Sequence, residues 1–65
     1  MTLEEFISHL KHKSIDIKIR FETTVIYRGN VGMYQYWLSR GTYGKKYIES
    51  VTFDEIGIMI INLFV

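Results

Sequence analysis

The sequence contains no cysteine and no proline among its 65 residues. Without cysteine it has neither a disulfide framework nor a thiolate metal site. A chain of this length lies near the lower limit for folding alone, and many such chains need a disulfide, a metal or a partner subunit to supplement the core. Here the composition compensates, because 48% of the residues are hydrophobic and 15% are aromatic. We therefore expect a single small globular domain spanning residues 1–65.

The chain also lacks an excess of one charge and a long apolar run. Eight basic residues nearly balance seven acidic ones, whereas a dedicated nucleic-acid-binding domain usually has a stronger basic excess. The longest apolar run, residues 56–65, is about half the roughly 20 residues that a membrane-spanning helix needs. No N-terminal stretch has the layout of a signal peptide. These absences predict a soluble, cytoplasmic protein without a membrane partner.

The first twelve residues predict an amphipathic helix. Thr2 and Glu5 have the spacing of a capping box, in which each side chain binds the backbone N–H of the other residue. Four apolar residues then recur at the spacing of one helix face: Leu3, Phe6, Ile7 and Leu10. The basic residues 11–13 fall in the expected last turn, where they would complement the helix dipole.

Alternation in the next segment predicts a strand. Apolar and charged side chains alternate through residues 15–21, which is the pattern of a half-buried strand. A turn at Glu22 and Thr23 would join it to a second strand in "VIYRGN". Residues 31–40 are then expected to form a short helix, with Asn30 as its N-cap and Gly41 as its stop signal, while the tyrosines leave a strand as the alternative. The segment "KYIESVTF" has the composition of a third strand.

Residues 54–65 are open to two interpretations. A second capping box, formed by Thr52 and Glu55, would begin a helix. Against this, the isoleucines are β-branched, Gly57 is costly in a helix, and the segment would be apolar all round. We favour a strand that follows a hairpin turn at Asp54 and Glu55, and its two apolar faces suit either a central position or one face covered by a partner. The expected fold is α+β, in the order α-β-β-α-β-β, with a four-stranded antiparallel sheet and two helices packed on one face.

Catalytic and cofactor signatures are missing from this sequence. The serines have no nucleophile elbow around them, and no triad pattern is present. His9 and His12 have a spacing that helical metal sites use, but they lie opposite the apolar helix face, beside lysines. We therefore expect no enzymatic activity, no cofactor and no metal.

The stretch "MYQYWLSRGTYGKKY", residues 33–47, combines aromatic and basic residues without an acid. A helical wheel directs Tyr34 and Trp37 towards the core, which leaves as candidate partner-binding residues Tyr36, Arg40, Tyr43, Lys45 and Lys46. Tyrosine and arginine are enriched at protein–protein hot spots, while aromatic rings beside cations also bind nucleic acids. We interpret the surface as a protein-binding site. A nucleic-acid-binding module using the same residues and a solvated fringe without a partner are the alternatives.

The edges of the sheet predict a second route to a partner. Edge strands carry unpaired backbone groups that can pair with another chain. A chain this small can gain stability by such pairing. The sequence thus predicts a homodimer, formed through an edge strand or through the C-terminal strand.

Four pieces of the sequence, "IDIKI", "VIYRGNVG", "YIESV" and "IGIMII", span most of the chain. Their layout resembles that of small phage or mobile-element accessory proteins of low-GC bacteria: a helix, a hairpin ending in aromatic-x-Gly, a short helix and a closing hairpin. The resemblance implies a protein that binds and modulates or inhibits a host protein. It implies no catalytic residue.

Overall fold

The computed structural model describes residues 1–38, 41 and 43–65, and the side chains of these residues except 35–38. These described residues form six elements in chain order: α1 (Leu3–Ser8), β1 (Asp16–Phe21), β2 (Thr24–Asn30), α2 (Val31–Leu38), β3 (Ile48–Phe53) and β4 (Met59–Leu63). The predicted α+β class and the order of the elements are confirmed.

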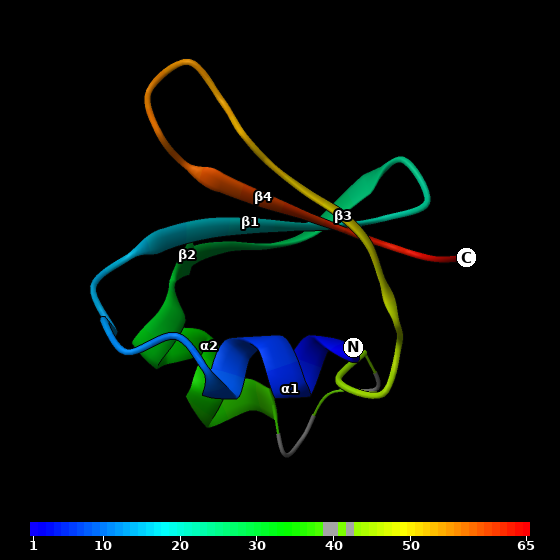
Figure 1. Ribbon diagram of the computed structural model, residues 1–65, viewed down its shortest axis with the longest axis horizontal. Helices are drawn as coiled ribbons and strands as arrows, with labels where there is room; N and C mark the ends of the chain where they lie inside the picture. The colour runs from blue at the N-terminus through cyan, green and yellow to red at the C-terminus, as the bar shows by residue number, and fades with distance from the viewer. Residues whose placement is uncertain (39–40, 42) are drawn as a thin grey trace.

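The prediction of an all-antiparallel sheet is wrong at the centre of the sheet. The strands lie in the order β2-β1-β4-β3. Each hairpin is antiparallel, but β1 and β4 run parallel, with Ile17 opposite Met59. The cause is the connection between β2 and β3, which contains α2 and so carries the chain below the sheet (Figure 1). Such a crossover makes β3 run in the same direction as β2, and therefore β4 in the same direction as β1.

Helix α1 begins as predicted but ends early. The hydroxyl of Thr2 accepts the N–H of Glu5 at 3.3 Å, and the Glu5 carboxylate accepts the N–H of Thr2 at 2.8 Å. The helix ends at Ser8, because the Ser8 hydroxyl and the His9 ring both bind the Glu5 carbonyl, at 2.7 and 2.6 Å. The His9 N–H then donates to the Phe6 carbonyl, a tighter pattern that closes the helix. Residues 11–13 therefore follow the helix instead of forming its last turn.

Helix α2 follows β2 directly, without a loop. The side-chain carbonyl of Asn30 accepts the N–H of Met33 at 2.7 Å, which confirms Asn30 as the N-cap. The helix extends to Leu38, and residues 39 and 40 of the predicted span lie outside the described residues.

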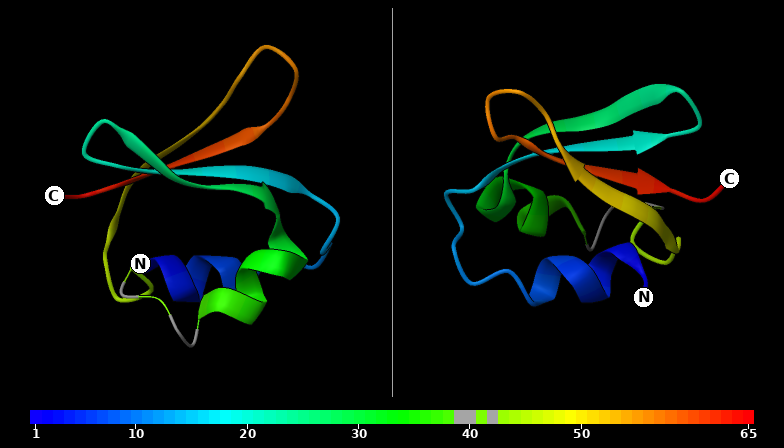
Figure 2. Two further views of the ribbon diagram at one scale, coloured as in Figure 1. Left: turned by 180° about the vertical axis from the view of Figure 1, so that it is seen from behind. Right: turned by 45° about the horizontal axis from the view of Figure 1, so that its top comes forward.

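The core lies between the two helices and the central strands. Figures 1 and 2 show α1 and α2 on the same side of the sheet. The buried side chains come from both helices and from β1 and β4: Leu3, Ile7, Ile17, Ile19, Val31, Tyr34, Ile61 and Leu63. Lys18 and Arg20 alternate with the buried isoleucines of β1, so the prediction of a half-buried strand is confirmed.

Both hairpin turns lie where the sequence places them. Glu22 adopts a φ of 61° between β1 and β2, in the left-handed region. In the second turn a carboxylate oxygen of Asp54 accepts the N–H groups of Ile56 and Ile58, at 3.0 and 2.9 Å. Gly57 has a φ of 89°, which favours glycine. The strand interpretation is confirmed for β4, and so is its central position.

Among the described residues, neither helix has the length and apolar character needed to cross a membrane.

Candidate protein-binding surface

The structure describes three of the five predicted partner-binding side chains. Tyr36 belongs to α2, but its side chain lies outside the described residues, as does Arg40 altogether. Tyr43, Lys45 and Lys46 lie in the segment that leads into β3. Each of these three contacts another part of the chain, so the segment is built into the fold.

Tyr43 and Lys46 both contact Phe21, at the end of β1. The rings of Tyr43 and Phe21 lie 5.4 Å apart between centroids at an angle of 58°. The Lys46 ammonium lies 4.6 Å from the centroid of the Phe21 ring, within the range of a cation–π contact. Tyr43 is half-buried against the core, so only part of its side chain is accessible at the surface.

Lys45 is paired with Glu4 of α1, at 2.7 Å between Nζ and Oε1. The hydrogen bond to Glu4 raises the pKa of Lys45 above its ordinary value, and the charge of Glu4 adds to the effect. The Lys45 side chain is 85% exposed, and pairs this exposed contribute little to stability because water screens them. Separating Lys45 from Glu4 therefore costs little free energy.

The backbone of this segment caps the N-terminus of α1. The N–H of Leu3 donates to the Lys46 carbonyl at 2.9 Å, and the N–H of Glu4 to the Gly44 carbonyl at 3.0 Å. The first turn of a helix leaves such N–H groups without a partner inside the helix. The cap therefore fixes the two lysines relative to α1.

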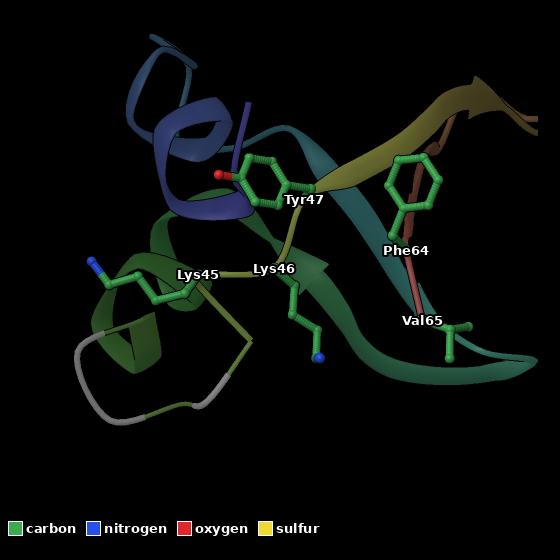
Figure 3. Close-up of a pocket in the computed structure, with 5 residues that line it drawn as sticks. All are labelled: Lys45, Lys46, Tyr47, Phe64 and Val65. Atoms are coloured by element: carbon green, nitrogen blue, oxygen red, sulfur yellow. The ribbon is translucent and has the colours of Figure 1, made fainter.

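The C-terminal residues complete an exposed surface that the sequence did not predict. The N–H of Phe64 donates to the Tyr47 carbonyl at 3.0 Å and brings the chain end beside the lysines. Tyr47, Phe64 and Val65 are 62%, 54% and 85% exposed. Together with the lysines they line a pocket, which we call the lysine–aromatic surface: Lys45, Lys46, Tyr47, Phe64 and Val65 (Figure 3).

Sequence reasoning missed Phe64 and Val65 because it treated residues 54–65 as one apolar strand. Strand β4 ends at Leu63, and its buried residues alternate, with Ile61 and Leu63 facing the core. Continuing that alternation would have directed Phe64 away from the core.

The lysine–aromatic surface carries two cations, two aromatic rings and an aliphatic side chain. Figure 3 shows Lys45 directed away from the other four side chains, so the two ammonium groups lie on different sides of this surface. In the described part of the chain, no cluster of three histidine or acidic residues could hold a metal ion.

A second surface, the open face of the sheet, is basic. Lys18, Arg20 and Arg28 project from β1 and β2 on the side opposite the helices, because they alternate with or lie opposite the inward residues. Lys18 lies directly opposite Arg28, an arrangement of like charges that is destabilising in a sheet. Among the described residues, none of the three forms a salt bridge.

Comparisons of this chain with protein-family models, curated proteins and solved structures found no match.

Proposed function

We propose that this protein is a non-enzymatic binding protein that acts stoichiometrically on a protein partner through the lysine–aromatic surface. The observation that carries the proposal is that Tyr47, Phe64 and Val65, all more than half exposed, line one pocket together with two lysines. Exposed apolar side chains gathered in one place are typical of interaction sites.

The way the backbone is held supports this proposal. Hydrogen bonds join the surface to the N-terminal segment and to α1: Ile48 donates to the Met1 carbonyl, and Lys46 accepts from Leu3. A site held in this way loses little conformational freedom when a partner binds, so more of the contact energy appears as affinity. The partner's matching surface is apolar, with acidic groups placed for Lys45 and Lys46.

The resemblance to phage and mobile-element accessory proteins adds a cellular role to the proposal. Such a protein acts in the bacterial cytoplasm by occupying a surface of a host protein and modulating or inhibiting it. Tyr36 and Arg40 stay in the proposed partner-binding set as sequence predictions.

Affinity capture from a bacterial lysate, with and without nuclease, tests the proposal. We expect a protein partner that survives nuclease treatment and binds the Phe64→Ala variant at least about tenfold more weakly, as for a hot-spot residue. Ile56→Ala is the control, because Ile56 is also an exposed apolar residue, at 78%, but lies in the turn at the other end of the β3–β4 hairpin. Equal binding of both variants would exclude the lysine–aromatic surface.

The alternative, a nucleic-acid-binding module, is supported by the open sheet face. Its three cations, which form no salt bridge among the described residues, could contact phosphates, although the formal net charge is only +1. A salt titration distinguishes the two functions, since nucleic-acid binding falls steeply with salt in proportion to the phosphates contacted. If the nuclease-treated lysate yields no partner and Lys18→Ser with Arg28→Ser abolishes binding to RNA or DNA, the alternative replaces the proposal.

A further inference from the structure

Strand β3 leaves part of its backbone unpaired at the edge of the sheet. It is the outermost strand beside β4. The N–H of Asp54 donates to the Ile58 carbonyl at 3.0 Å, which makes these two residues a hydrogen-bonded pair. Pairing alternates along an antiparallel ladder, so Thr52 also bonds inward, while the backbone groups of Val51 and Phe53 point outward.

The same edge already accepts an extended segment at its other end. The N–H of Ile48 donates to the Met1 carbonyl at 3.1 Å, and Thr2 forms an antiparallel bridge with Tyr47. This pairing stops at Ile48. Beyond it, among the described residues, nothing pairs with the outward groups of Val51 and Phe53.

The side chains of this free segment are apolar and exposed. Val51 lies opposite Ile61 and Phe53 opposite Met59, so both lie on the helix side of the sheet. The β3–β4 hairpin extends away from the helices (Figures 1 and 2), which leaves Val51 37% and Phe53 65% exposed. The segment contains no proline and no lysine, the residues that commonly protect an edge from pairing.

We propose that two copies of this chain pair antiparallel through β3, around a two-fold axis at Thr52. In this register the backbone N–H and C=O of Val51 bond to the C=O and N–H of the second copy's Phe53. The two-fold axis gives Phe53 the same two bonds to the second copy's Val51. The two four-stranded sheets become one continuous sheet.

The side chains support a second copy as the occupant, since the register is self-complementary. Each Val51 lies opposite the second copy's Phe53, a β-branched residue against an aromatic ring, which is a favourable cross-strand pair. On the other face, Thr52 meets its own copy on the axis, and paired threonines can form a hydrogen bond. Ser50 lies opposite the second copy's Asp54, so no like charges face each other within residues 50–54. Beyond this segment Glu49 comes opposite the second copy's Glu55, which lies in the turn and not in the strand. The formal net charge of +1 adds little repulsion between copies.

The sequence predicts a homodimer through either an edge strand or the C-terminal strand. The fold favours the edge strand. Strand β4 is paired on both sides, by β1 and β3, so its backbone has no free edge. The proposed dimer does not depend on the lysine–aromatic surface, whose partner is a different protein.

Sedimentation equilibrium and amide exchange of the intact chain test the dimer. We expect a monomer–dimer equilibrium between about 1 µM and 1 mM, with the dimer fraction rising with concentration. Over the same range, exchange at the Val51 and Phe53 amides should slow with rising concentration. The Thr52 amide, already bonded to β4, should be protected throughout. A monomer at every concentration would overturn the proposal.

Two matched lysine variants show whether a lost dimer results from the β3 edge or from unfolding of the chain. Val51→Lys should weaken the dimer at least about tenfold, because lysine protects an edge. Val25→Lys is the control, since Val25 is 45% exposed on the opposite edge strand, β2. Val51→Pro removes an N–H that β4 does not use and should also block the dimer. A dimer that survives both Val51 variants in their folded state would contradict the assigned edge.

Discussion

The rings of Tyr27 and Tyr34 lie 4.8 Å apart between centroids and join β2 to α2. Tyr34 is only 7% exposed, as the helical wheel predicts. The Tyr27 hydroxyl donates to the Asn30 carbonyl at 2.8 Å, immediately before the helix begins. The pair thus fixes the angle at which the chain leaves the sheet, and burial raises the pKa of both phenols.

This tyrosine pair predicts a loss of stability at alkaline pH. The pKa of Tyr34 is raised in the folded state above its ordinary value of 10.0. Above about pH 10 the unfolded chain therefore loses its phenolic proton first, and the free energy of unfolding falls as pH rises. Thermal unfolding between pH 8 and 11 measures the effect, and Tyr34→Phe should flatten the profile. An unchanged slope in that variant would assign the dependence to another group.

The capping box predicts a smaller loss at acid pH. Hydrogen bonds from the backbone and side chain of Thr2 lower the pKa of Glu5, so its contribution is present at neutral pH and is lost as pH falls through the folded-state pKa. Thr2→Ala should lower the free energy of unfolding at pH 7 by about 1 kcal/mol. It should also reduce the dependence on pH between 5 and about 3, where unperturbed carboxylates titrate. Chemical denaturation at several pH values tests both, with Thr23→Ala in the exposed turn as the control.

The parallel register predicts which engineered cysteines can be linked. Lys18 lies opposite Ile60 on the open face of the sheet. In the chain without native cysteine, Lys18→Cys with Ile60→Cys should form a disulfide under mild oxidation, because neighbouring strands are about 4.8 Å apart. Lys18→Cys with Asn62→Cys, displaced along the strand, should react more slowly. Mass spectrometry after oxidation measures both, and faster linkage of the displaced pair would exclude the register.

Glu4 competes with a partner for Lys45. Replacing Glu4 by Gln removes the charge paired with the ammonium at 2.7 Å and leaves Lys45 free to meet an acidic group. Once the partner is identified, Glu4→Gln should tighten binding several-fold, and Lys45→Ala should weaken it by a similar factor. The melting temperature of both variants should change little, as the pair is exposed. Titration calorimetry gives the affinities, and Lys11→Ala controls for the loss of a positive charge elsewhere.

Local elements of this fold were predictable because their signals lie within short windows. The capping box of α1, the alternation of β1 and both hairpin turns depend on neighbouring residues, and the structure confirms them. The end of α1 was not predictable from apolar spacing, because Leu10 continues the stripe. Side-chain bonds to the Glu5 carbonyl close the helix first.

The topology and the candidate site depended on contacts between distant segments. Apolar and charged residues alternate in β1 in the same way whether the neighbouring strand runs parallel or antiparallel. The parallel pairing of Ile17 with Met59 therefore cannot be predicted from the residues of β1. For the same reason the sequence grouped Lys45 and Lys46 with residues nearby in the chain. The fold instead places them beside Phe64.

The central pairing of β1 with β4 has a consequence for the kinetics of folding. The two strands lie roughly forty positions apart in the chain, so the entropy of closing that loop must be lost before their contacts form. Each hairpin can form early and locally, but neither buries a core without the other. We therefore expect a single cooperative transition whose rate-limiting step is the meeting of the two hairpins. Substitutions at Ile19 or Ile61 should then slow folding more than substitutions in either turn.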